Sequence, residues 1–594
     1  MPQLSDRIAK RRTSQRRRRA RSRARDPRRV PNRDSRGSGI GREPPATKPL
    51  VQGSAFLAVL WAAATIVLLV VYYPALRGEF VSDDSIYIVK NIWIHRFGLA
   101  NLREILDPWG GPASFTANFA PVILLLHALQ WSLFGANPLG YHLTNIGLHA
   151  LVSVLLVPLL RRAGVAPQAA LFGAALFLLH PANVEVVAWV SQEKTLVAMA
   201  LAQGALLFHP RRPVLAVLCF VLAILTKGLA AFALPVAAWW VWAKRHEQLP
   251  RLGWLAVWVA LLCLYAAPEF TAFGSAGELG APLGHDVATH LRTIIAFAAR
   301  YTAMALTSFG VGPLHQPPLA TSIADPWFLC GILLGLLFGW RALLTLRRSS
   351  PEGGFWIWAA IAYAPISQIF PFVYPLADRY LYFILPGGIG AVLLAGQEAL
   401  SRVAFVHLSS TWRIARGLTR DRMAIAIALL ACTSFALRTN AQAWSWRSGA
   451  ALVDAAVRGS PDGISAHLRA AEDAARQADA GAAATELRAA ADRGWNDVVG
   501  ISYASAFAPV RNDPRFQAAL VELAGRFIED AKRSGLSSQP ALLCWARAHE
   551  IRGERAEQRA LLERTIAVGG PWTDLARRLL AEAERVDEVT KPRD

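Results

Sequence analysis

Charged residues are scarce in this 594-residue chain. Only 18% of its residues are Asp, Glu, Lys or Arg, whereas 54% are hydrophobic and the mean hydropathy is +0.30. An ordinary soluble domain carries about 25% charged residues, and a disordered chain has too few apolar residues to build a core. The composition therefore excludes a simple soluble domain, and it excludes disorder for most of the length.

Cysteine is scarce as well, with five residues in the whole chain. Four of them lie inside apolar runs, and the fifth, Cys544, stands alone towards the end. Their spacing matches neither a zinc site nor a disulfide framework. We interpret all five as structural.

The sequence is rich in long apolar runs. Residues 54–73, 148–160 and 328–340 are examples, and about 17–25 apolar residues are needed to cross the hydrocarbon core of a membrane. We predict an all-α fold, a polytopic bundle of about 11 transmembrane spans followed by a soluble helical domain. The predicted domains are a disordered tail (1–50), a transmembrane domain (51–438) and a helical domain (441–594).

The first 48 residues are strongly basic. They hold 17 Lys and Arg against four acidic residues, so this segment cannot build a core and is expected to be disordered. We interpret it as a cytoplasmic topology determinant that contacts anionic lipids, rather than as a nucleic-acid-binding arm. The segment is too long, and lacks the cleavage pattern, for a cleavable signal peptide.

The basic turns between the apolar runs indicate one topology. Positive residues stay on the cytoplasmic side, and pairs such as Arg161-Arg162 and Arg211-Arg212 end alternate spans. This rule places the N-terminus inside and the C-terminal domain outside the cytoplasmic (inner) membrane. The segments 119–134 and 290–311 are predicted to be re-entrant or interfacial. Counting 290–311 as a crossing would place Arg341, Arg347 and Arg348 outside, against the charge rule, and 119–134 is flanked by segments predicted to lie outside,.

The C-terminal domain has a helical pattern rich in Ala, Arg and Glu. Residues 464–494 and 541–570 each read as two helices joined by a short turn, which is about the length of a tetratricopeptide unit. A generic helical hairpin domain is the alternative. Either would offer a groove suited to a peptide.

Several polar clusters are expected at the outer ends of the spans, where charged groups usually line a cavity or a substrate path. His142, Asn145 and His149 share one helix face because their spacing is i, i+3, i+7,. The complete set of candidate residues is Asp83, Asp84, His142, Asn145, His149, His180, Glu185, Lys194, Lys227, Asp378, Arg379 and Tyr380. The carboxylates could deprotonate a hydroxyl, and the cations could hold a phosphate.

Five of these segments, in this order, resemble a known family. They are FVSDDSIYIVKN (80–91), GYHLTNIGLHA (140–150), HPANVEVVAWVSQEK (180–194), TKG (226–228) and PLADRYLYF (375–383). The chain resembles the GT-C membrane glycosyltransferases, and most closely the branch in which transmembrane spans precede tetratricopeptide repeats, which includes protein O-mannosyltransferases. The resemblance implies an inverting transfer of a sugar from a polyprenyl phosphate to a hydroxyl on the extracytoplasmic face.

The resemblance also implies roles for individual residues. Asp83 is expected to be the general base, with Asp84 beside it and Glu185 as a further acid. Cationic residues, above all Lys227 and Arg379, are expected to stabilise the leaving phosphate, while Asp378 is predicted to pair with Arg379.

Other expectations concern the rest of the site and its partners. The histidines His142, His149 and His180, with Asn145, Lys194 and Tyr380, are expected to shape the sugar and phosphate pocket. A divalent metal is possible, because members of the family differ in this respect. The acceptor is a protein, recruited by the repeats, or a cell-envelope glycan. The alternative function is a non-catalytic scaffold or transport protein with a peptide-docking domain.

Overall fold

The computed structural model describes most of the chain beyond the basic tail. The described residues are 53–96, 98–116, 118–209, 211–243, 252–275, 283, 286–369, 375–406, 412–534, 537–569 and 572–590. Every regular element in these ranges is a helix, so the all-α prediction is confirmed. The predicted disorder of residues 1–50 lies outside the described residues.

Six helices of the described chain are long and apolar enough to cross a membrane. They are α2 (Ser54–Val71), α7 (Pro138–Arg162), α14 (Leu252–Ser275), α16 (Pro326–Arg347), α18 (Leu381–Val406) and α19 (Trp412–Ala443). A seventh candidate is the pair 167–178 and 181–188, which is bent by 50° at a short break. The break coincides with His180-Pro181, because proline cannot donate the helical hydrogen bond at this point.

The remaining predicted crossings coincide with shorter apolar helices. These are α8 (Pro167–Leu178), α10 (Glu193–Phe208), α11 (Pro213–Ile224), α12 (Ala233–Ala243) and α17 (Pro351–Tyr363). Each predicted span therefore has a helix, but the total of 11 crossings stays a prediction. The two segments predicted not to cross form α6 (Pro121–Phe134) and α15 (Val287–Thr307).

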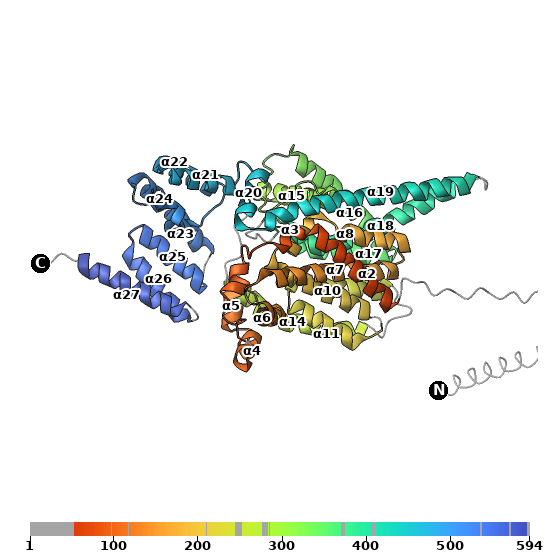
Figure 1. Ribbon diagram of the computed structural model, residues 1–594, viewed down its shortest axis with the longest axis horizontal. Coiled ribbons are helices and arrows are strands. Elements are labelled where there is room, and N and C mark those ends of the chain that lie inside the picture. Colours follow the sequence, from red (N-terminus) through yellow and green to blue (C-terminus); the bar gives the residue numbers. More distant parts are fainter. Residues whose placement is uncertain are drawn as a thin grey trace, which may run out of the picture. The chain divides into compact units, whose positions relative to one another are not determined.

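The bundle is built around α7. Its most apolar window is 61% buried, whereas those of α2 and α19 are 17% and 6% buried. Helices α2, α8 and α10 pack directly against α7, and Figure 1 shows the spans running alongside one another. The outer helices keep apolar side chains such as Val70 and Leu430 exposed, as expected for surfaces that contact lipid tails.

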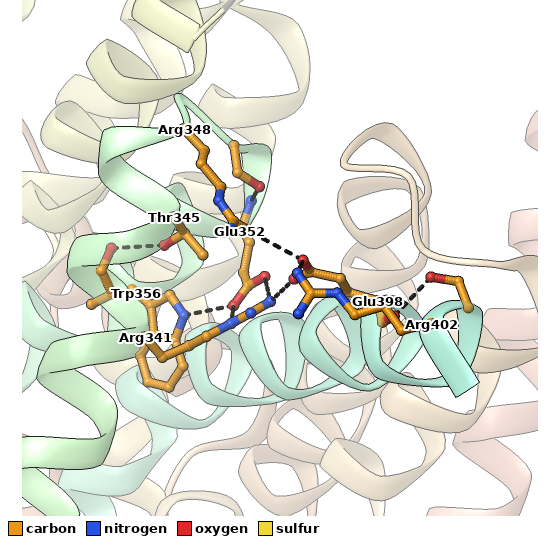
Figure 2. A network of polar contacts seen from close by, with 10 residues as sticks. Arg341, Thr345, Arg348, Glu352, Trp356, Glu398 and Arg402 are labelled. Atoms are coloured by element: carbon orange, nitrogen blue, oxygen red, sulfur yellow. Dashed lines mark hydrogen bonds and ion pairs between the residues drawn. The ribbon is translucent and has the colours of Figure 1, made fainter. Parts of the chain in front are cut away.

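One end of the bundle is held by a charged network between α16, α17 and α18 (Figure 2). Arg341 donates to both carboxylate oxygens of Glu352, at 2.8 and 2.6 Å, and also bonds Glu398. Trp356 donates to Glu352 at 2.9 Å. The Ser350 hydroxyl caps α17 by accepting from the Glu352 amide at 3.2 Å. The three helix ends are therefore fixed by charge-assisted bonds.

The C-terminal part is a series of helical hairpins. Its helices are α20 (Gly449–Gly459), α21 (Ile464–Arg476), α22 (Ala480–Asp492), α23 (Val498–Tyr503), α24 (Pro514–Ser534), α25 (Gln539–Ile551), α26 (Arg555–Val568) and α27 (Thr573–Thr590). The pairs α21–α22 and α25–α26 coincide with the two hairpins predicted from the sequence, and each pair packs together. Ala478 turns the first pair with a φ of 58°. The assignment to tetratricopeptide repeats stays a prediction.

Candidate active site

The paired aspartates lie on a tight turn after α2. The chain reverses at Ser82, whose φ of 52° lies in the left-handed region. The Asp83 carbonyl then accepts from the amides of Ile86 and Tyr87, both at 2.9 Å, which starts the π-helical turn η2 (Ser85–Val89). The Asp83 carboxylate is partly exposed, and within the described chain its hydrogen bonding is limited to the Ser82 hydroxyl at 3.5 Å. Asp83 is thus available to an outside group.

Asp84 is fully buried and its carboxylate is satisfied by the protein. One oxygen accepts from the Val81 amide at 2.9 Å, and the other accepts from the amide of Ser191 at 2.7 Å and from its hydroxyl. Burial raises the pKa of Asp84 to about 7, although these hydrogen bonds oppose the shift. The indole of Trp189 adds a bond to the Val81 carbonyl at 3.2 Å. Asp84 therefore ties the Asp83 turn to residues 189–191, and its geometry favours a structural role.

Lys194 follows this tied segment and points towards η2. Its ammonium donates to the Tyr87 hydroxyl at 2.8 Å and lies 4.2 Å from the centre of the same ring. The Tyr87 hydroxyl in turn donates to the Thr116 carbonyl at 3.1 Å and accepts from the Asn118 amide at 3.3 Å. Lys194 is thus held in a fixed direction near the Asp83 turn rather than extending freely along the surface.

Lys227 lies between α11 and η5 (Gly228–Phe232) and points towards α10. Its ammonium donates to the Thr195 hydroxyl at 2.8 Å. Burial lowers the pKa of Lys227 well below its usual value; the charges of Lys194 and Arg379 act in the same direction, and Glu185 opposes them. The amino groups of two lysines therefore lie close enough to influence each other, and each bonds a neutral hydroxyl group.

Arg379 forms the third cationic element. Its guanidinium pairs with Glu185, and its backbone amide donates to the other Glu185 oxygen at 2.8 Å. The guanidinium carbon lies 5.6 Å from the centre of the Trp189 ring and 4.9 Å from that of Tyr380. Glu185 is therefore a charge partner of Arg379, which makes it a poor candidate for a free base.

The predicted pair between Asp378 and Arg379 is wrong. Asp378 instead pairs with His315 at 2.6 Å and accepts from the Gly312 amide at 2.9 Å. Burial works against a charge on His315, but the Asp378 carboxylate outweighs it and raises the pKa of the imidazole. Consecutive residues of a 3-10 turn are about 120° apart around the helix axis, so the side chains of Asp378 and Arg379 point in different directions and have different partners.

Two of the candidate histidines are engaged in packing the bundle. His149 bonds the Tyr382 hydroxyl at 2.9 Å and the Leu178 carbonyl at 3.0 Å. The second of these histidines, His180, bonds the Ala305 carbonyl through Nε2 at 2.9 Å. These bonds join helices across the apolar interior, as polar side chains often do in membrane proteins.

The other two members of the polar stripe also face the protein. Asn145 donates to the carbonyls of Val187 and Trp189 at 3.2 and 3.4 Å. His142 is buried, with Nε2 lying against the backbone of Gly78. Asn145 therefore fixes the backbone of the segment that carries Trp189.

Four important residues escaped the sequence analysis. Tyr87 and Thr195 hold the two lysines, His315 holds Asp378, and Glu269 on α14 accepts from the Phe119 amide at 2.9 Å. Glu269 left a signal that could have been used, since it is the only charged residue of α14 and an ionisable group inside an apolar span is usually functional. The others left none, because their roles depend on distant partners.

The site thus combines one accessible carboxylate with a group of cations. The turn that carries Asp83 is bonded through Asp84 to Ser191, three residues before Lys194, and Lys227 lies near Lys194 and the Arg379–Glu185 pair. Within the described ranges, no group of three His, Cys, Asp or Glu side chains is placed to hold a metal ion. A carboxylate can accept a proton, and the cations can stabilise an anion such as a phosphate.

Comparison with known proteins gives partial matches to one group of curated relatives. Protein O-mannosyl-transferase TMTC4 of Homo sapiens is 30% identical over 167 residues, which cover 23% of this chain and 21% of the relative. Protein O-mannosyl-transferase TMTC1 of Homo sapiens is 32% identical over 190 residues, covering 30% and 20%. Protein O-mannosyl-transferase Tmtc1 of Drosophila melanogaster is 33% identical over 124 residues, covering 20% and 14%. No family model and no solved structure matches the chain.

These matches confirm the resemblance to the O-mannosyltransferase branch that the five motifs indicated. The match spans about a fifth of the length of these relatives. The activity, donor and acceptor of the whole protein are therefore proposals.

Proposed function

We propose that the protein is a membrane glycosyltransferase that moves a sugar, with mannose as the first candidate, from a polyprenyl phosphate to a hydroxyl group of an acceptor protein. The names of the relatives support the sugar and the protein acceptor. The observation that carries the proposal is the tie between the Asp83 turn and the segment of Lys194, made by Asp84 and Ser191. This tie supports the proposal because it joins the turn that carries Asp83 to Ser191, which lies three residues before Lys194.

In the proposed reaction the acceptor hydroxyl attacks the anomeric carbon of the sugar. The new bond joins the acceptor oxygen to this carbon, and the bond between the carbon and the phosphate oxygen breaks. Asp83 takes the proton of the hydroxyl, and the electron pair of the broken bond goes to the polyprenyl phosphate. Attack opposite to the leaving group inverts the configuration of the anomeric carbon.

The cations act on the leaving group. Lys194 and Lys227 bond neutral hydroxyl groups in the structure, so a phosphate can replace these bonds with stronger charge-assisted ones. The phosphate gains negative charge as it leaves, and fixed cations stabilise this charge most in the transition state. The pairing of Glu185 with Arg379 limits how far the arginine can contribute. We leave His142, Asn145, His149, His180 and Tyr380 out of the proposed site.

The experiment uses the purified full-length protein in detergent or nanodiscs, with labelled polyprenyl-phosphate mannose and Ser/Thr-rich acceptor peptides. We expect transfer by the wild type and a loss of about 10²–10⁴-fold for Asp83→Asn, the usual contribution of a general base. Glu79→Gln is the matched control, because Glu79 lies on the same loop, and among the described residues its side chain bonds only the Gly449 amide. Transfer that survives Asp83→Asn would remove the assigned base. Binding of lipid phosphate with no turnover for any donor would support the non-catalytic alternative.

A further inference from the structure

Glu269 is the one charged side chain of α14, whose other residues are apolar, small or polar but uncharged. Burying a carboxylate in an apolar span costs free energy, so such residues usually have bonding partners and a function. Glu269 is partly buried, and its neighbours connect it to both lysines of the proposed phosphate site. Two chains of contacts make this connection.

The first chain leads to Lys194. Glu269 accepts from the Phe119 amide at 2.9 Å, which fixes the segment that precedes α6. The preceding residue, Asn118, donates to the Tyr87 hydroxyl at 3.3 Å, and this hydroxyl accepts from Lys194 at 2.8 Å. Glu269 thus fixes the position of Asn118, which bonds the same Tyr87 hydroxyl as Lys194 does. The two charges also interact directly through space.

The second chain leads to Lys227. The Tyr265 hydroxyl, one helical turn before Glu269, hydrogen-bonds both Glu269 and the backbone of Gly228. A Cβ at Gly228 would lie 3.2 Å from this hydroxyl oxygen, so the close approach favours glycine here. Because Gly228 follows Lys227 directly, this contact fixes the turn from which Lys227 reaches Thr195.

The charge of Glu269 has a separate consequence. Lys194 and Lys227 repel each other, and the carboxylate of Glu269 attracts Lys194, so it offsets part of this repulsion when the site is empty. The same carboxylate repels a bound phosphate, in proportion to the charge of that phosphate. In the proposed reaction the donor is a phosphodiester with one negative charge, whereas the product is a phosphomonoester that carries up to two. Repulsion by Glu269 therefore weakens product binding more than donor binding.

We propose that Glu269 is a positioning residue of the phosphate site that holds both lysines in place and favours release of the polyprenyl monophosphate product. This inference rests on the proposed function for its account of donor and product. The binding of lipid phosphates, however, can be measured without any turnover.

The test is a binding titration of the full-length protein in detergent with a short-chain polyprenyl monophosphate and with the matching polyprenyl-phosphate mannose. Glu269→Gln keeps the shape and an acceptor oxygen but removes the charge. We expect the affinity for the phosphodiester to rise about threefold and the affinity for the monophosphate about tenfold. The second factor is about the square of the first, because the monophosphate carries twice the charge of the phosphodiester. If the wild type transfers mannose, kcat should fall while KM falls.

Two further variants separate charge from support. Tyr265→Phe keeps the carboxylate but cuts the chain to Gly228, so both affinities should fall together and their ratio should stay constant. Glu398→Gln removes a carboxylate about 25 Å away from Leu381, the first residue of α18, at 1.5 Å per residue,, and should change neither affinity.

Equal affinities of wild type and Glu269→Gln for the monophosphate would overturn the proposal. So would a gain in affinity that is the same for both ligands, because a purely structural role cannot distinguish their charges. If Glu269→Gln does not purify as a folded protein, Glu269→Asp moves the carboxylate away by one methylene and must change the ratio of the two affinities in the same direction. Absence of transfer by the wild type would contradict the proposed function and leave the binding result standing.

Discussion

At the scale of single residues, hydrogen bonding separates the acidic side chains into two classes. Asp84 and Glu185 have donors from the protein on both carboxylate oxygens. Asp83 has a single long contact within the described chain. A general base needs a lone pair that faces the substrate. In the proposed reaction, the role of general base is therefore better assigned to Asp83 than to Asp84 or Glu185.

Burial of Asp84 predicts how stability depends on pH. Its pKa is about 7 in the folded protein and 3.8 in the unfolded chain. Between these values the folded protein keeps a proton that the unfolded chain has lost, so the free energy of unfolding falls as the pH rises from about 4 to 7, by up to about 4 kcal/mol. We expect the melting temperature of the wild type, followed by tryptophan fluorescence in detergent, to drop across this window more than that of Asp84→Asn.

The neighbouring residue provides the control for this measurement. Asp83→Asn changes the same turn at a partly exposed position, and its melting curve should follow the pH dependence of the wild type. Parallel pH profiles for the wild type and Asp84→Asn would contradict a buried, protonated Asp84.

At the scale of elements, the network of Figure 2 fixes the ends of three helices. Glu352 is 3% exposed and receives two bonds from Arg341 and one from Trp356, whereas the Glu398 side chain is 31% exposed and bonds arginines that reach the surface. Buried and exposed ion pairs differ strongly in energy, because only the buried charge cannot return to water when its partner is removed.

We expect Glu352→Gln to destabilise the bundle by about 3 kcal/mol, since it leaves the Arg341 guanidinium without its bidentate partner. The matched variant Glu398→Gln should cost less than about 1 kcal/mol. Thermal unfolding in one detergent compares the two variants directly. Equal shifts in melting temperature would mean that burial does not control the strength of this network.

At the scale of the whole molecule, we predict the orientation in the membrane from the basic turns. Arg161 and Arg162 end α7, and Arg347 and Arg348 lie at the end of α16. Because positive residues stay in the cytoplasm, both ends should lie inside. We propose that the residues after α19 lie outside, so that the C-terminal hairpins share a compartment with Asp83.

A fusion experiment tests this orientation. Alkaline phosphatase fused after Asp594 should be active and green fluorescent protein dark at the same position, whereas fusions after Arg162 should behave in the opposite way. A fluorescent C-terminal fusion would mean an even number of crossings. It would also separate the hairpins from the proposed site.

Local pattern was enough to determine much of this protein. Apolar run length predicted the apolar helices, helical periodicity predicted the pairs α21–α22 and α25–α26, and short motifs singled out Asp83, Lys194 and Lys227 as candidates. The predictions of helices succeed because hydrophobic length and helical period are properties of contiguous residues.

Only the tertiary structure decided which charges meet. In the folded chain Asp378 pairs with His315 and Arg379 pairs with Glu185. His149 and His180 form hydrogen bonds between packed helices. The tertiary structure also connects Glu269 to both lysines. The physical reason is that each of these contacts joins residues far apart in the chain, and the direction of a side chain depends on how the helices that carry it pack.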